Sequence, residues 1–596
     1  MVTVVLAWCV FFLTVTGAGC LTTLGVSRLT HGRTGCSLGV FQTFWIGLAA
    51  VVAFTQLWSL RLPVNGLCLA VVLVLSAMGL PAFARLVRAR GAACCPAQPR
   101  DWIRMGLLAA GAIAAVGLGA RGLATHSWSG AYDTELYHFS WIRWANEYPA
   151  VPGLANLHSR LATPSGFLLF SALIDNLWWD RSSAWLTNGF LVTLAAVHWL
   201  AMILAPARDL PLRARILSLL TLPYVLRLLV GLRPALYFDG ITLLTQMLLL
   251  IELLRFQPLV SRKKEADPHD LATAVLVLLS LAVLGFCFKP IGAMSLLFVG
   301  GLSAGILWRV ASSGRSGAIS AAAAAFIPGL VLVGYFARNA ILSGWLLYPA
   351  PAGKLNVAWA LPRHPLGITH DHEMQSVEGQ YTVNKAWARV PGPEYRRAVR
   401  EGASFWFPRW RERVWRGSTP RLLYIGAFLV AVHLVIAMAQ KKLGHPLGWD
   451  GFLIGLAGAN ILFWFWGVPD LRFGDAFFRL WFALGFALLF SSPVLTGRSR
   501  ALLCAVAFAF MVNVEPWRFA TNRQPSMWGV GKAEPQPTKL VTLSNGQTPP
   551  LTVRVPETGD QCGDTALPCT PYPLNELRER KPGNFRYGFF LVLPGL

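Results

Sequence analysis

The sequence predicts an all-α, polytopic transmembrane helix bundle of about 14 spans, with external interfacial helices and a small external C-terminal tail. Hydrophobic residues make up 55% of the 596 positions, charged residues make up only 13%, and long apolar runs recur along most of the chain. Each run has about 18 to 22 residues, enough for a helix to cross about 30 Å of hydrocarbon. A soluble domain could not bury so much apolar surface.

The predicted spans follow these runs in order. They cover residues 1–22, 38–58, 64–82, 103–121, 184–205, 214–232, 237–256, 270–288, 292–310, 319–337, 421–439, 450–468, 474–496 and 500–514. The apolar stretch 166–179 is too short, so we predict a surface or re-entrant element there. The resulting regions are N-terminal spans (1–121), a first external loop (122–183), central spans (184–337), a long external loop (338–420), C-terminal spans (421–514) and an external tail (515–596).

The positive charge of the chain sets its predicted orientation. Lys and Arg outnumber Asp and Glu by 52 to 28, a formal net charge of +24 that in a soluble chain would suggest nucleic acid. Here the basic residues gather in short clusters between apolar runs, most clearly within 85–100 and 255–264, as expected of cytoplasmic loops. We therefore expect a lipid bilayer as partner and no nucleic acid, and a multi-pass protein of a bacterial inner (plasma) membrane with both termini external.

Two cysteines stand apart in the polar tail. Cys562 and Cys569 flank a short segment that ends in proline, and no histidine lies in residues 515–596. This arrangement favours a disulfide in an oxidising periplasm over a zinc site.

The first external loop carries the most suggestive side chains. Asp133, Tyr137, Trp141 and Trp144 are spaced to share one face of a helix that would lie along the membrane. An acid at the start of such a helix can take the proton of an attacking hydroxyl, and cations beside it can hold a departing phosphate. The alternative is that Asp133 only caps the helix. The catalytic candidates are Asp133 and Glu135, and the substrate-binding candidates within this loop are His138, Asn156, His158 and Arg160.

Further candidates lie near predicted span ends. Lys289 precedes a proline between two spans, Arg338 and Asn339 open the long loop, and Arg472 follows Asp470 in an external turn. Each could contact a phosphate, or could simply reach toward lipid headgroups. Asp239, at the start of a span, is predicted to be a helix cap rather than a ligand.

The sequence gives little support to metal-dependent or nucleotide-dependent chemistry. The run from His370 to Glu373 holds four ligand-type side chains too close together to converge on one ion, so no metal site is predicted. A divalent cation is left open as a cofactor. The sequence has no phosphate-binding glycine loop and no serine nucleophile elbow, which argues against a nucleotide-driven pump. A lipid-linked donor would supply an already activated substrate.

An acid beyond an early span, an interfacial helix and the returning Pro152, Asn156 and Arg160 resemble the first external loop of GT-C glycosyltransferases. The resemblance covers about 40 residues. It implies transfer of a sugar from a polyprenyl-phosphate donor to an external glycan or lipid acceptor, in cell-envelope polysaccharide biosynthesis, with Asp133 as the base. The chain departs from the GT-C pattern in having more spans, and in placing Glu135 two residues after Asp133 where an adjacent acidic pair is usual.

A more extensive similarity is to an uncharacterised family of bacterial multi-pass membrane proteins, and this similarity implies no activity. Its pieces lie at 132–138, 153–160, 338–344, 387–389, 469–473 and 567–572. Two alternatives to the transferase stay open. One is a polysaccharide polymerase or ligase that works through Arg and His without a carboxylate base, and the other is a transporter or flippase of lipid-linked glycans.

Overall fold

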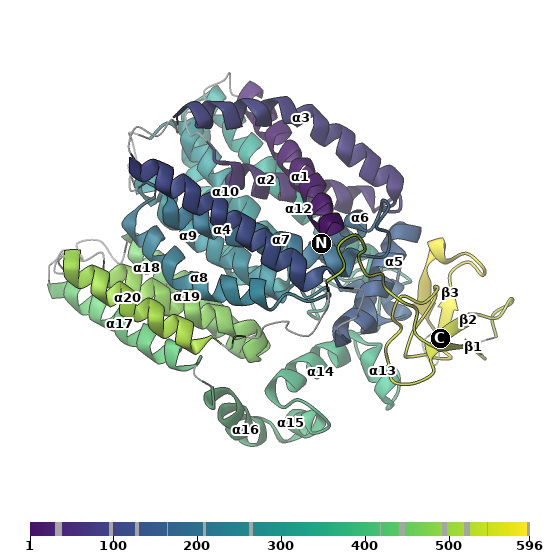
Figure 1. Cartoon of the computed structure of the whole chain (residues 1–596). Helices are drawn as coiled ribbons and strands as arrows, with labels where there is room; N and C mark the ends of the chain where they lie inside the picture. Colours follow the sequence, from purple (N-terminus) through teal and green to yellow (C-terminus); the bar gives the residue numbers. More distant parts are fainter. Residues whose placement is uncertain are drawn as a thin grey trace.

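A computed structural model describes residues 1–29, 38–93, 99–125, 130–163, 165–206, 210–261, 266–417, 419–439, 448–490, 497–515, 517, 525–544 and 546–592. Several of the predicted cytoplasmic basic residues, including Arg262, Lys263 and Lys264, lie outside these residues. Within the described part of the chain, a large helical bundle carries a cap of short helices, loops and strands at one end (Figure 1).

Twelve of the described helices are long and apolar enough to cross a membrane. They are α1 (Val2–Leu29), α2 (Val40–Trp58), α3 (Gly66–Ala93), α4 (Pro99–Leu123), α7 (Ser183–Leu204), α9 (Asp239–Ser261), α10 (Pro268–Phe288), α11 (Ala293–Ala311), α12 (Arg315–Ser343), α17 (Arg421–Ala439), α18 (Gly448–Gly467) and α19 (Leu471–Phe490). The two remaining predicted spans coincide with helices α8 (Leu212–Val230) and α20 (Gly497–Val514). The chain is therefore a helical, multi-pass membrane protein.

The helices differ in how much of their surface the protein itself covers. α10, α19, α9 and α2 are largely enclosed, whereas α3, α4, α11, α17 and α18 leave most of their apolar surface uncovered. Ile113, Trp308 and Trp466 are each more than 70% exposed on these outer helices. Such an apolar perimeter fits a lipid environment and would be unusual on a soluble monomer.

Close helix packing in the N-terminal part depends on glycine. A Cβ at Gly47 of α2 would lie 1.9 Å from the Val15 carbonyl oxygen of α1, and one at Gly79 of α3 would lie 1.9 Å from that of Gly17. Small residues let helix backbones approach this closely, which is the usual basis of tight packing between membrane helices.

One end of the bundle, which we call the capped end, carries the short elements. Here α2, α4, α8, α10, α12 and α18 finish, and α3, α7, α9, α11, α17 and α19 begin. The first loop forms a π-helical turn η1 (Thr134–His138), α5 (Phe139–Glu147), 3₁₀ turns η2 (Leu154–Asn156) and η3 (Ser159–Ala162), and α6 (Gly166–Ile174). Because α6 has only 9 residues, it is too short to span a bilayer.

The long loop and the tail complete the cap. The loop forms α13 (His370–Met374), α14 (Val377–Arg389), α15 (Tyr395–Glu401) and α16 (Ala403–Trp415). The tail adds strands that were not predicted: β1 (Thr538–Thr542) pairs antiparallel with β2 (Thr552–Pro556), and β3 (Leu577–Glu579) with β4 (Phe589–Leu591). Cys562 and Cys569 form a disulfide between the two hairpins. Tail and N-terminus meet at this end, where Val2 N donates to the Met527 carbonyl at 2.9 Å.

Candidate functional site

Five charged side chains from the first loop, α9, the end of α10 and α19 meet at the capped end, and we call them the charge cluster: Asp133, Arg160, Asp239, Lys289 and Arg472. Asp133 Oδ1 lies 3.5 Å from Arg160 Nη1, and its Oδ2 lies 3.4 Å from Arg472 Nη1. Arg472 Nε lies 3.5 Å from Asp239 Oδ2, and the Lys289 ammonium pairs with the other oxygen of Asp239. Three cations thus face two carboxylates, leaving one positive charge in excess.

Local structure explains why Asp133 faces its partners. The residue precedes η1, but its side chain makes no capping hydrogen bond to the helix. The carboxylate is instead held by two guanidinium groups, so the alternative of a simple helix cap is not what the structure shows. A π-helical turn directly after Asp133 is a local departure from α geometry, and such turns occur frequently at functional sites.

Arg160 and Lys289 are each positioned by a break in helical structure. Arg160 lies in the 3₁₀ turn η3, with its guanidinium 5.8 Å from the centre of the Tyr137 ring. Lys289 closes α10 in an extended conformation, as expected of a residue before proline, and the 3₁₀ turn η4 (Pro290–Gly292) follows. Its ammonium lies 3.7 Å from the centre of the Phe473 ring, a cation–π contact that also ties the Lys289 turn to α19.

Arg472 and Asp239 come from the first turns of two spanning helices. The N-terminus of α19 disfavours a cation, but Asp470 Oδ1 accepts a hydrogen bond from the Arg472 backbone nitrogen at 2.8 Å and supplies the opposite charge there. Asp239 is the first residue of α9. It was predicted to be a cap and is instead the second carboxylate of the cluster. A signal was present in the sequence, because Lys289 and Asp239 both lie at span ends predicted for the external side.

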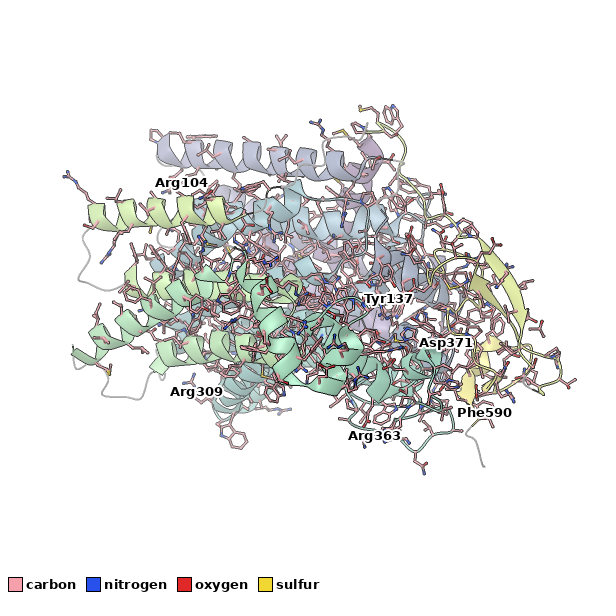
Figure 2. The ribbon with its side chains drawn as sticks, turned by 90° about the horizontal axis from the view of Figure 1, so that it is seen from below. Arg104, Tyr137, Arg309, Arg363, Asp371 and Phe590 are labelled. Carbon is pink, nitrogen blue, oxygen red and sulfur yellow. A yellow bond between two sulfur atoms is a disulfide. The ribbon has the colours of Figure 1, made fainter. Side chains whose placement is uncertain are left out.

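The cluster is partly open to solvent. The side chains of Asp133, Arg160 and Lys289 are 22–24% exposed and that of Arg472 is 43% exposed. Arg160 Nε is buried and finds no hydrogen-bond partner among the described residues. Because the guanidinium groups of Arg160 and Arg472 remain partly exposed at the same place, an incoming anion can still reach them. Tyr137, which flanks the cluster, lies between the bundle and the tail strands, whereas Arg104 and Arg309 lie toward the other end (Figure 2).

Burial and neighbouring charges shift the pKa of the Asp133 carboxyl in opposite directions. Burial raises the pKa of Asp133, but the charges of His138, Arg160, Arg472 and Lys289 outweigh burial and hold this pKa below its ordinary value. Asp133 is therefore ionised at neutral pH. The His138 charge contributes only in acid, because burial lowers the pKa of His138 to about 4.

Two buried histidines flank the cluster without being part of it. His138 Nδ1 lies 3.4 Å from the Thr134 hydroxyl, and its Nε2 has no hydrogen-bond partner among the described residues. Neither ring nitrogen of His158 has such a partner there, and its ring lies edge-on to Tyr572 of the tail. Burial, followed by the charge of Arg160, lowers the pKa of His158 to about 3. Both rings are neutral near pH 7.

The remaining predicted site residues lie away from the cluster. Glu135 is 8% exposed and faces the tail, where Gln536 Nε2 approaches its carboxylate at 3.4 Å. The side-chain amide of Asn156 donates to the carbonyl oxygens of Gly153, Trp359 and Phe589, joining the first loop to the long loop and to the tail.

Arg338 and Asn339 were predicted to open the long loop, but α12 continues to Ser343 and buries both. Arg338 donates to the Ser59 hydroxyl at 2.6 Å and stacks on Trp141 at 5.2 Å, and Asn339 donates to the Leu346 carbonyl. Neither residue pairs with Asp133. The predicted aromatic face of the first loop also turns inward, since Trp141 and Trp144 are each 2% exposed.

No clear metal site is formed by the described residues. Groups of three or more His, Cys, Asp or Glu side chains suited to an ion are absent from that part of the chain. In the run from His370 to Glu373, His372 Nε2 lies 3.4 Å from Glu576 and His370 Nδ1 lies 3.6 Å from Glu373. His372 therefore faces a carboxylate of the tail, whereas His370 faces one within its own helix, so the two histidines pair with different carboxylates.

The fold and the charge cluster define a multi-pass membrane protein that gathers ionised side chains at one end of its helix bundle. The chain belongs to the family described as a domain of unknown function (DUF8201), whose model matches residues 1–479. All five residues of the charge cluster fall within the matched segment, and the β-strands of the tail fall outside it. No curated protein and no solved structure shows a significant match.

Proposed function

We propose that the protein is an inner-membrane glycosyltransferase of GT-C type that moves a sugar from a polyprenyl-phosphate donor to a glycan or lipid acceptor outside the cell. In this proposal the chain crosses the bilayer 14 times, and the capped end faces the periplasm together with both termini. The observation that carries the proposal is the contact of the Asp133 carboxylate with Arg160 and Arg472 at one end of the bundle.

The cations of the cluster supply the phosphate site. Arg160, Arg472 and Lys289 come from three different segments and carry one more positive charge than the carboxylates beside them. Guanidinium groups bind phosphate through paired N–H donors, and the excess charge favours an anion. A phosphate at the end of a bilayer-spanning bundle is where a lipid-linked donor would present it.

Asp133 then acts as the general base. An acceptor hydroxyl attacks the anomeric carbon, the bond from that carbon to the phosphate oxygen breaks, and the hydroxyl proton passes to the Asp133 carboxylate. The phosphate leaves with the electron pair and stays paired with the cations. Binding of the phosphate draws Arg160 and Arg472 away from Asp133, which raises the pKa of the carboxyl and makes it a better base in the loaded site.

A transfer assay with a matched acid control tests the proposal. Protein in liposomes is given a panel of polyprenyl-phosphate hexoses and pentoses together with membrane acceptors. We expect Asp133→Asn to lower covalent transfer about 100-fold or more, the usual contribution of a positioned base, and Glu135→Gln to change it only a few-fold. Unchanged transfer by Asp133→Asn contradicts the assignment of the base. If transfer survives in that variant but is lost in Arg160→Gln, the polymerase or ligase mechanism without a carboxylate base is supported instead.

One observation favours transport as a second candidate function. Glu252 lies inside α9, is 1% exposed, and is approached by Gln42 Nε2 at 2.9 Å and by Arg255 at 3.5 Å. Ionisable side chains buried among membrane helices often mark a transport path. Movement of labelled lipid-linked glycan across the bilayer without any covalent product, and its loss in Glu252→Gln, would support this candidate over the transferase.

A further inference from the structure

A second polar site lies at the other end of the segment that carries Asp133. A cavity of about 260 Å³ opens between α5, the connection from α6 to α7, and the tail. Arg143, on its wall, follows Asp133 by ten residues, about 15 Å along a helix. The cavity and the charge cluster share no residue.

The cavity wall offers hydrogen-bond donors and acceptors in fixed positions. Arg143 Nε pairs with Glu147 at 2.6 Å, and Arg143 Nη1 donates to the Asp564 carbonyl at 3.2 Å. Arg181 pairs with the other oxygen of the Asp564 carboxylate from that which Arg143 approaches. Asp180 pairs with Lys532 of the tail at 2.5 Å. Side chains from the first loop and from the tail therefore hold one another in place before any ligand binds.

The charge of the wall restricts what it can bind. Four carboxylates line the cavity, against two guanidinium groups and the Lys532 ammonium that pairs with Asp180, so one negative charge is in excess and an anionic ligand is disfavoured. The lining residues are Glu147, Asp175, Asp180 and Asp564 against Arg143 and Arg181. A metal ion has no suitable group of ligands in the described residues. The side-chain amides of Asn146 and Asn176 also line the cavity, with the Asn176 nitrogen bound to the carbonyls of Val64 and Ala172, and Phe139 and Ile142 add an apolar patch.

Backbone strain is concentrated in the same wall. Leu177 has φ 138° and Arg181 has φ 61°, and these are the two non-glycine residues with positive φ in the described part of the chain. Such conformations are strained and persist where the surrounding structure enforces them, often at ligand sites. Here the connection that holds both residues shapes one side of the cavity.

We propose that this cavity binds a neutral, hydroxyl-rich saccharide unit. Hydroxyl groups both donate and accept, so they match a wall that holds carboxylates, guanidinium groups and amides, and the apolar patch suits the C–H face of a sugar ring. The volume, below the range of about 300–1,000 Å³ typical of drug-sized ligands, fits a single unit. The proposal does not rest on the transferase activity, since saccharide recognition here would serve a transporter as well.

Binding measurements on the full-length protein in lipid nanodiscs test this site. The probes are neutral tetrasaccharides built from glucose, mannose or N-acetylglucosamine. Their binding is measured by calorimetry. We expect at least one probe to bind. We expect Glu147→Ala and Asp180→Ala each to lower the affinity for that probe about 10- to 100-fold, because each variant removes a charged hydrogen-bond acceptor. The matched control is Glu394→Ala, which removes a comparably exposed carboxylate paired with Arg397 at 3.4 Å elsewhere on the cap; it should leave binding unchanged.

Two further measurements distinguish loss of binding from loss of folding, and saccharide binding from electrostatic attraction of a cation. Unchanged thermal unfolding of Glu147→Ala shows that weaker binding is not a folding defect. Affinity for a neutral saccharide should vary little between 50 and about 500 mM salt, whereas attraction of a cation falls steeply. The proposal is overturned if no neutral probe binds, if Glu147→Ala and Asp180→Ala bind as the unaltered protein does, or if only a polyamine such as spermidine binds.

Discussion

Asp133 and Arg472 are separated by 339 residues in the chain, and their side chains approach to 3.4 Å at the capped end of the bundle. The contact joins the first loop to the first turn of α19. Through Arg472 it continues to Asp239 and Lys289, so the loop, α9, α10 and α19 share one electrostatic network. Any ligand that binds these cations must compete with Asp133 for them.

The arginines of the cap should differ in role. We expect Arg160→Gln and Arg472→Gln each to reduce binding of a short-chain polyprenyl phosphate about 10-fold or more, because each removes a charged donor. Arg338→Gln is the matched control, since Arg338 lies at the same end of the bundle but is held by Ser59 and Trp141. It should lower the unfolding temperature and leave phosphate affinity within about twofold. Equal loss of affinity in all three variants would contradict this division.

Lys289 and Asp239 should behave as a coupled pair. Asp239→Asn removes the carboxylate that pairs with Lys289 and Arg472, so these two cations lose a counter-charge and we expect the unfolding temperature to fall. Lys289→Met alone should also destabilise the protein, and the double variant should be less destabilised than the sum of the two single changes. A double-mutant cycle followed by tryptophan fluorescence during heating measures the coupling. Strict additivity would show that the contact contributes nothing to stability.

Acid should destabilise the cap through its buried histidines. The pKa of His158 is about 3 and that of His138 about 4 in the folded protein, against an ordinary value of 6.5. The unfolded chain therefore takes up protons first as the pH falls. Stability contributed by each histidine is complete above about pH 6.5 and declines below it, by about 1.4 kcal/mol per pH unit until the folded pKa is reached.

The check is the unfolding temperature from pH 7 to pH 4 for the unaltered protein and for His158→Gln. The unfolding temperature of the variant at pH 7 can differ from that of the unaltered protein. Between pH 7 and pH 4 it should fall less than that of the unaltered protein, because the variant has one buried histidine fewer. A variant whose unfolding temperature falls as steeply as that of the unaltered protein would assign the acid sensitivity to other groups.

The tail disulfide should hold the two hairpins of the tail together. Cys562 and Cys569 are seven residues apart, and closing so short a loop is worth about 2.5 kcal/mol in the chain-entropy picture. We expect Cys562→Ser to speed tryptic cleavage of the tail, at sites such as Arg554 and Arg578, with the bundle left intact. Cys504→Ser, which removes a free cysteine of α20, is the control. Equal cleavage rates in the two variants would mean that the disulfide does not stabilise the tail.

The sequence predicts the helices of the bundle well because the bilayer leaves few options. A span must be about 20 apolar residues long with its backbone hydrogen bonds satisfied internally, so hydropathy alone marks most of the helices. The ends of the helices are harder to predict from hydropathy. Polar Arg338 suggested that the loop had begun, but its charge is satisfied inside the fold by Ser59 and Trp141, and α12 runs on to Ser343.

The site could be predicted only in part. Asp133 and Arg160 were identified in the first external loop, and Lys289 and Arg472 as charges near span ends, where ionised groups need water or a partner. Which of them pair depends on how helices far apart in sequence pack, and no local pattern encodes that. For the same reason Asp239 was taken for a cap, and the aromatic face of α5 was expected to lie on the membrane when it packs inside the cap.

The most direct test of the central claim is the affinity of a short-chain polyprenyl phosphate for Asp133→Asn, measured in nanodiscs beside the unaltered protein. If the cations of the cluster form a phosphate site from which Asp133 is displaced, removing its charge should tighten binding about 10-fold even though transfer is lost. Binding that is unchanged or weaker in Asp133→Asn would show that the phosphate does not compete with Asp133 and would contradict the account.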